Sequence, residues 1–439
     1  MSKFPQGFLI GAATAAHQVE GNNIHSDYWA MEQMKYTAFA EPSLDAVDHY
    51  NRYEEDIKMM AKAGLNAYRF SIEWARIEPK QGEFDETEIE HYRKVLECCK
   101  ENNVEPIVTL MHFTSPKWLI EKGGWENEET VGFFANYCNY VVEQLGSYMH
   151  YVCTINEANM GLQIAAISAR YRVQMMAKMA QMQQSDASKA GEEAAKSTAG
   201  SVQVGLNMQK MMENMQKQGE ENMEVFGTAT PQVFVSARTP EGDLLVMKAH
   251  QTAKEAIKSV NPSLQVGITL SLHDIQAKEG GEGKAAKEWE EEFLHYVPYI
   301  KEDDFFGLQN YTRSVYDANG ICAAPKDAEL TQMDYEIYPQ ALEACIRKAY
   351  DKLQMPIMVS ENGIAVEDDA KRVDFITRAT DGIVNCIADG IPVNGYMYWS
   401  LMDNFEWQKG FSMTFGLIAV DRAIQKRIAK PSLAHLGSL

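Results

Sequence analysis

Cysteine is scarce in this sequence, with seven residues in a chain of 439. The seven stand singly except for the neighbours Cys98 and Cys99, and no Cys-x-x-Cys spacing occurs. An odd number of cysteines without metal-binding spacing speaks against a disulfide framework and against a structural zinc site. We therefore expect reduced, mostly buried thiols in a cytoplasmic protein.

Long hydrophobic runs and basic residues are also in short supply. No stretch of about twenty apolar residues is present, so the sequence predicts no transmembrane helix, and residues 1–5 contain no apolar signal core. Against 62 acidic residues there are 41 basic ones, which gives a net charge of −21. Because such a charge repels nucleic acids and anionic membranes, we expect neither as a partner, whereas a homo-oligomer is compatible with the composition.

Eight short apolar runs alternate along the chain with amphipathic segments of helical period. The expected strands are residues 8–15, 66–72, 105–111, 151–157, 265–270, 304–308, 356–361 and 393–399. The expected helices are residues 47–63, 87–101, 128–145, 243–260, 339–353 and 369–389. Strictly alternating strands and helices with short joints are typical of βα units. The prediction is an α/β fold, a single (β/α)8 TIM barrel domain over residues 1–439.

This alternation is interrupted by an excursion at about residues 165–227, after the fourth expected strand. Residues 172–223 contain no aromatic residue but nine of the 24 methionines, at spacings of three and four. That period predicts two helices, joined near residues 197–200. Either the methionines fill gaps where the helices pack on the barrel, or the excursion forms an adaptable wall on the leaving-group side of a site.

Two of the expected strands end in a carboxylate beside an amide. Residues 356–363 read PIMVSENG and residues 151–157 read YVCTINE, which places Glu361 and Glu157 at strand ends. Taken alone, the first stretch fits a helix cap with a solvated glutamate equally well. In a parallel barrel, however, the C-terminal ends of all strands meet at one mouth, where two carboxylates can serve glycoside hydrolysis.

Three motifs of this chain resemble those of the family 1 glycoside hydrolases, the β-glucosidase family. Residues 154–157 (TINE) and 360–363 (SENG) are similar to the two catalytic motifs, and residues 399–407 (WSLMDNFEW) match very specifically. The resemblance implies a retaining mechanism with Glu361 as nucleophile and Glu157 as acid/base, without a metal or organic cofactor. The two carboxyl groups would then lie roughly 5 Å apart.

The resemblance also assigns residues to the sugar. The implied substrate-binding set is Gln18, His112, Asn156, Tyr311, Trp399, Glu406 and Trp407. In this assignment Gln18 and Glu406 hold the far hydroxyls, and Asn156 holds the 2-hydroxyl. Each residue alone has an ordinary explanation, such as a core histidine, barrel packing or a surface ion pair. Together they occupy the ends of strands one, three, four and eight, which separate packing roles would not require.

A second group supports the nucleophile. The resemblance places Arg69 and Tyr311 beside Glu361, where a cation and a phenol keep it ionised. Glu157 must instead hold a proton at rest, and the nearby charge of Glu361 would contribute to the raised pKa that this requires.

The chain departs from the family pattern at four positions near the site. Ala158 stands where the family usually has proline, Phe113 where it has tryptophan, and Thr414 where it often has arginine. Gln309 replaces an asparagine, so no role is carried over to it. None of these changes removes a catalytic group.

The sequence therefore predicts a retaining β-glycosidase for terminal β-glucosyl residues, with β-galactosyl or β-fucosyl residues as the next candidates. One alternative is a 6-phospho-β-glucosidase. Such an enzyme needs a serine, lysine and tyrosine phosphate pocket after strand eight, where this chain has Glu406 and Trp407. The other alternative is a non-catalytic sugar-binding barrel, which would be expected to have lost one glutamate.

Overall fold

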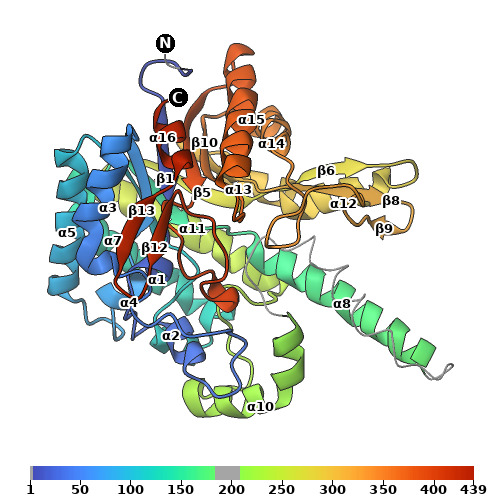
Figure 1. Cartoon of the computed structure of the whole chain (residues 1–439). Coiled ribbons are helices and arrows are strands. Elements are labelled where there is room, and N and C mark those ends of the chain that lie inside the picture. Colours follow the sequence, from blue (N-terminus) through green and yellow to red (C-terminus); the bar gives the residue numbers. More distant parts are fainter. Residues whose placement is uncertain (1–2, 183–207) are drawn as a thin grey trace.

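A computed structural model of the chain describes residues 3–182 and 208–439 and contains a closed barrel of parallel strands (Figure 1). Its eight strands are β1 (Leu9–Ala13), β2 (Ala67–Ser71), β3 (Glu105–Met111), β4 (Tyr151–Ile155), β5 (Gln265–Ser271), β7 (Phe305–Gln309), β10 (Ile357–Asn362) and β11 (Val393–Trp399). They neighbour one another in chain order, and β11 pairs with β1 to close the barrel. The predicted (β/α)8 fold is confirmed.

The barrel strands are buried on both faces, as parallel strands covered by helices usually are. Every residue of β2 and of β10 is buried, including Arg69, Glu361 and Asn362. Charged groups inside a barrel are costly unless they are paired. The buried charged residues of β2 and β10, Arg69 and Glu361, therefore indicate a polar network at the end of the barrel.

Long helices cover the outside of the barrel. They are α3 (His49–Ala63), α5 (Glu86–Glu101), α7 (Glu129–Leu145), α11 (Pro240–Val260), α14 (Ala341–Leu353) and α15 (Asp369–Ala388), which confirms the six predicted helices. Local sequence sets their ends. The Asp85 carboxylate accepts the Thr87 N–H at 2.8 Å and so caps α5. Gly64 ends α3 with φ 103°, and a side chain there would strike the Gly437 carbonyl oxygen.

Shorter helices connect or follow the barrel units. They are α1 (Ala16–Val19), α2 (Asp27–Glu32), α4 (Trp74–Ile77), α6 (Lys117–Glu121), α13 (Val297–Ile300) and α16 (Pro431–Gly437). The sequence analysis missed a small sheet of β6 (Asp274–Ala277), β8 (Arg313–Asp317) and β9 (Gly320–Ile321), on which α12 (Glu282–Glu292) packs. It also missed the hairpin of β12 (Ile418–Asp421) and β13 (Lys426–Ala429). Strands of two to five residues give too short a pattern to stand out.

The excursion after β4 contains the two predicted helices, α8 (Met160–Met182) and α10 (Met208–Phe226), while the expected joint at 197–200 lies outside the described residues. In Figure 1, α8 projects away from the barrel and α10 lies below α2. Met215 and Met223 are 67% and 53% exposed. These two methionines therefore do not fill gaps against the barrel.

The structure bears on two further expectations, the absence of a transmembrane helix and the burial of the cysteines. None of the helices in the described part of the chain combines the length and apolarity needed to cross a membrane. All seven cysteines are free thiols; Cys322 is half-buried and the other six are buried. The prediction of mostly buried thiols is confirmed.

Candidate active site

The C-terminal mouth of the barrel contains a cavity that opens to solvent, with about 300 Å³ of empty space including the solvent at its opening. Its lining consists of His112, Phe113, Asn156, Glu157, Tyr311, Glu361, Trp399, Glu406, Trp407 and Phe415. Eight of these ten were predicted from the sequence as site residues, and Phe113 and Phe415 were not. The two remaining predicted residues, Gln18 and Arg69, lie behind this lining and bond to glutamates within it.

Glu361 is held from both sides, by Arg69 of β2 and by Tyr311, which lies two residues beyond β7. One carboxylate oxygen pairs with the guanidinium of the buried Arg69, and the other accepts a hydrogen bond from the Tyr311 hydroxyl at 2.5 Å. Both contacts favour a negative charge on the carboxylate. His112 Nε2 lies 3.9 Å from the same glutamate, but burial, and then the charge of Arg69, lower the pKa of His112 well below its usual value.

Glu157 lies two residues beyond β4, in a different environment. Burial raises the pKa of Glu157 well above its ordinary value, and the charge of Glu361 adds to the effect. Its backbone has φ 43°, a left-handed conformation that costs about 1–2 kcal/mol in a residue with a side chain. The Glu157 N–H donates to Thr269 Oγ1 at 2.9 Å, which helps to hold this conformation.

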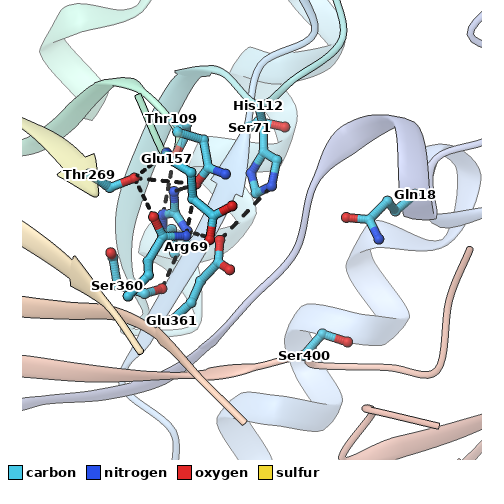
Figure 2. Close-up of polar contacts among 12 residues, drawn as sticks. Gln18, Arg69, Ser71, Thr109, His112, Glu157, Thr269, Ser360, Glu361 and Ser400 are labelled. Atoms are coloured by element: carbon cyan, nitrogen blue, oxygen red, sulfur yellow. Dashed lines mark hydrogen bonds and ion pairs between the residues drawn. The ribbon is translucent and has the colours of Figure 1, made fainter. Parts of the chain in front are cut away.

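A hydrogen-bond relay across three strands ties these groups together (Figure 2). Asn156 Oδ1 accepts from Arg69 Nη2 at 2.5 Å and from Gln309 Nε2 at 3.1 Å, and Thr269 Oγ1 donates to Gln309 Oε1 at 2.6 Å. Asn156 Nδ2 has no protein partner among the described residues. Its oxygen is thus fixed by the protein while its N–H groups remain able to donate to a bound molecule.

Sequence reasoning missed Thr269 and Gln309, although both carry a usable signal. Each is a polar residue in the last part of a buried strand, β5 or β7, where an apolar side chain would otherwise be expected. The long amide side chain of Gln309 spans from Thr269 to Asn156.

Glu406 lines the far end of the cavity, and Gln18 lies behind it. Gln18 Nε2 donates to the Phe405 carbonyl at 2.8 Å and to Glu406 Oε2 at 3.2 Å, while its Oε1 has no protein partner among the described residues. Burial, and then the charge of Glu361, raise the pKa of Glu406 to about 8. Near neutral pH this carboxyl group can therefore donate as well as accept a hydrogen bond.

Flat aromatic rings line the remaining wall. The His112 ring stacks on Trp399 with centroids 5.6 Å apart and on Trp407 at 6.1 Å. Phe113, in place of an indole, packs against Trp407 at 5.3 Å. Rings in this arrangement present apolar faces beside the polar groups, which suits a molecule with hydroxyls on its edges and C–H bonds on its faces.

The raised pKa of Glu406 predicts a pH-dependent stability. A carboxyl group whose folded pKa of about 8 exceeds its ordinary 4.5 stabilises the fold fully at low pH. That contribution is lost as pH rises through the folded value. Glu406→Gln keeps the size of the side chain but cannot ionise. The melting temperature of this variant, relative to that of the wild type, should therefore rise as pH increases from about 4.5 to 8. Thermal scans across this range test it, and a constant difference would contradict it.

Chemically, a barrel mouth with two buried glutamates in contrasting environments, beside amide groups and indole faces, defines a glycoside hydrolase. The chain belongs to glycosyl hydrolase family 1, whose family model matches residues 1–439. Among the residues described, no group of three or more acidic, histidine or cysteine side chains is arranged to hold a metal ion.

Named relatives are similar over nearly the whole chain. A 1,4-β-D-glucan glucohydrolase from Thermotoga neapolitana is 28% identical, over 98% of this chain and 97% of its own. A 6-phospho-β-galactosidase from Clostridium acetobutylicum is 26% identical, over 98% and 96%. The crystal structure of β-glycosidase BGL167 is similar with a TM-score of 0.86 and 42% identity, covering 99% of this chain and 96% of that one. The apo structure of β-glucosidase 1317 has a TM-score of 0.83 and 36% identity, covering 98% and 97%.

Proposed function

We propose that this protein is a retaining β-glycosidase that removes terminal, non-reducing β-D-glucosyl residues, with β-galactosyl and β-fucosyl residues as the next substrates. One observation carries the proposal: two glutamates line the same cavity in opposite electrostatic environments. Glu361 faces a cation and a phenol, whereas burial keeps the pKa of Glu157 high. Opposed environments of this kind separate a nucleophile from an acid.

The proposed reaction proceeds in two displacements. In the first, Glu361 attacks the anomeric carbon while Glu157 donates its proton to the departing glycosidic oxygen. In the second, Glu157 takes a proton from water, which attacks the same carbon and releases Glu361. Two inversions return the sugar with its original configuration. The expected separation of the two carboxyl groups, roughly 5 Å, remains a prediction of this mechanism.

Sugar recognition follows from the donors and faces around these glutamates. We assign Gln18 and Glu406 to the far hydroxyls, and the Nδ2 group of Asn156 to the 2-hydroxyl near the nucleophile. Trp399 and Trp407 would cover the C–H face of the ring. Because Gln18 and Glu406 each offer both donor and acceptor capacity, they could accept either arrangement of the 4-hydroxyl, which keeps galactosides in consideration.

A 6-phospho-β-glycosidase is the second candidate, because relatives of that name match nearly the whole chain. The cavity argues for the unphosphorylated sugar. Neither lysine nor arginine is among the described residues that line it, and Glu406 occupies its far end. A phosphate needs cationic partners, and Glu406 is not one in either protonation state; once ionised, it would also repel the phosphate.

A substrate panel tests the proposed function. On 4-nitrophenyl glycosides we expect kcat/KM for the β-glucoside to exceed that for the 6-phospho-β-glucoside by about a hundredfold or more, which corresponds to losing one or two charge-assisted contacts. The galactoside and fucoside should be hydrolysed less well than the glucoside. Equal or better hydrolysis of the phosphorylated substrate would reverse the choice between the two candidates.

We further propose that the whole chain acts as one catalytic domain in the cytoplasm. The continuous barrel from β1 to β11 supports a single domain, because the site draws residues from strands along its whole length. The net charge of −21 and the free cysteines are compatible with a reducing compartment.

A further inference from the structure

The α10 helix of the excursion contacts a segment that we name the strap, residues 34–41, between α2 and the β12–β13 side of the mouth. The Glu221 carboxylate of α10 accepts two successive backbone N–H groups of the strap, from Lys35 at 3.1 Å and from Tyr36 at 2.8 Å. Adjacent N–H groups that converge on one carboxylate form a charge-assisted anchor. This anchor joins parts of the chain that lie 185 or more residues apart.

Two lysines of α10 strengthen the same contact. Lys210 Nζ donates to the Phe39 carbonyl at 2.6 Å, and Lys217 Nζ lies 4.8 Å from the centroid of the Tyr36 ring. The first is a hydrogen bond to strap backbone, and the second is at cation–π distance. The strap therefore carries contacts from α10 at Lys35, Tyr36 and Phe39, which limits its freedom to move as a unit.

The other end of the strap contacts the loop that follows Glu406. The Ala40 N–H donates to the Gln408 carbonyl at 3.0 Å, and the Glu41 carboxylate accepts the Phe411 N–H at 3.0 Å. The Phe39 ring also stacks on Phe405 with centroids 6.1 Å apart. The strap thus reaches both sides of Glu406 and Trp407 along the chain.

The loop of residues 406–410 is held together by two backbone hydrogen bonds of its own, so its residues should move together. The Glu406 N–H donates to the Gly410 carbonyl at 2.7 Å, and the Gly410 N–H donates to the Trp407 carbonyl at 3.1 Å. Trp407 has φ 46°, a conformation that non-glycine residues adopt only when their surroundings hold them there. A displacement of Gln408 or Phe411 would therefore shift the side chains of Glu406 and Trp407 inside the cavity.

We infer that α10 positions Glu406 and Trp407 through the strap, and so tunes selection of the far hydroxyls of the sugar. The excursion then acts, through this helix, on the sugar side of the cavity. No described residue of the excursion is among those that line the cavity. Glu221 is the key positioning residue. The inference rests on the proposed function, since it assumes that Glu406 binds sugar hydroxyls.

The test compares Glu221→Ala with Glu224→Ala, an exposed acidic residue on the same helix. The substrates are 4-nitrophenyl β-glucoside and its 4-deoxy and 6-deoxy analogues, which lack the hydroxyls assigned to Glu406. For Glu221→Ala we expect kcat/KM on the glucoside to fall about five- to tenfold, as for one or two hydrogen bonds. On at least one deoxy analogue the fall should be less than about twofold, because the affected contact is already missing. Glu224→Ala should match the wild type on all three.

Glu221→Gln, which keeps the side-chain size and an acceptor oxygen, provides a second variant if the alanine protein folds poorly. Its falls in kcat/KM should rank the three substrates in the same order, but each fall should be smaller. Equal losses on all three substrates would overturn the inference, because a general structural defect does not distinguish hydroxyls. An unchanged Glu221→Ala enzyme would overturn it too. A wild-type protein that hydrolyses none of the three would instead overturn the proposed function, and the inference with it.

Discussion

Replacing Glu361 with alanine should lower kcat for aryl β-glucosides by about 10⁵-fold or more, the scale of loss when a covalent nucleophile is removed. The Tyr311 hydroxyl and the Arg69 guanidinium would then face no carboxylate, and no other described carboxylate is held by this pair. Steady-state kinetics at substrate saturation measures the effect. Glu367→Ala, an exposed position six residues further along, is the matched control and should keep wild-type rates.

Loss of Glu361 also leaves Arg69 buried without its anion, which costs about 3–5 kcal/mol in comparable buried pairs. Glu361→Gln limits this cost, because the amide keeps the volume and one acceptor. In the alanine variant, added azide should restore turnover by attacking the anomeric carbon from the vacated side, which gives a glycosyl azide of inverted configuration. A variant that hydrolyses substrate at a wild-type rate would contradict the assignment of Glu361.

Replacing Glu157 with glutamine should produce the second large effect, and its size should depend on the leaving group. General acid catalysis contributes about 10²–10⁴-fold, so kcat/KM should fall by that amount for a poor leaving group such as an alkyl alcohol. With 2,4-dinitrophenolate, which departs without a proton, the first step should be nearly unaffected. A loss of the same size across a series of leaving groups would contradict the role of Glu157.

The pH profile gives an independent view of the same residue. Because burial and the charge of Glu361 raise the pKa of Glu157, the wild-type group holds its proton to a higher pH than an ordinary glutamate does. Activity should then fall as pH rises through that pKa, since deprotonation removes the acid. The Glu157→Gln variant has no proton to lose there, and its residual activity should show no such alkaline fall. A profile with the same alkaline limb as the wild type would assign that limb to another group.

The barrel was predictable from the sequence because its strands are buried on both faces. Continuous apolar runs of the kind in β3 and β10 alternate with long amphipathic helices. This pattern can be recognised in the sequence alone, because it does not depend on which residues are in contact. The β6–β8–β9 sheet escaped because it depends on pairing between segments that are short and half-exposed. A helix start at Glu282 escaped for a related reason, since a glycine-rich polar stretch precedes it.

The site was predictable to the extent that its residues sit at strand ends. Glu157 and Glu361 could be paired in advance because barrel topology brings the C-terminal ends together. The link from Thr269 through Gln309 to Asn156 could not, since it depends on which side chains meet across β4, β5 and β7. The charge of Glu361 raises the pKa of Glu157, as expected from the sequence, but it is not the main cause. Burial is the largest contribution and the charge of Glu361 comes second.

The composition of the excursion predicted its helices but not the contacts that they make. Its methionine spacing correctly indicated helices, yet the groups that connect α10 to the site are Glu221 and Lys210. Their partners are backbone groups of the strap, which carry no sequence signature. A contact between a side chain and a distant backbone can be found only once the fold places them together.

The most direct test of the account is to identify the residue that carries the sugar between the two displacements. The enzyme would be incubated with 2-deoxy-2-fluoro-β-glucosyl fluoride, digested with a protease and analysed by mass spectrometry. The mechanism predicts one added fluoroglucosyl group, on the peptide that contains Glu361 and attached to that side chain. A label on another residue, or an enzyme that turns over the reagent without ever forming an adduct, would contradict it.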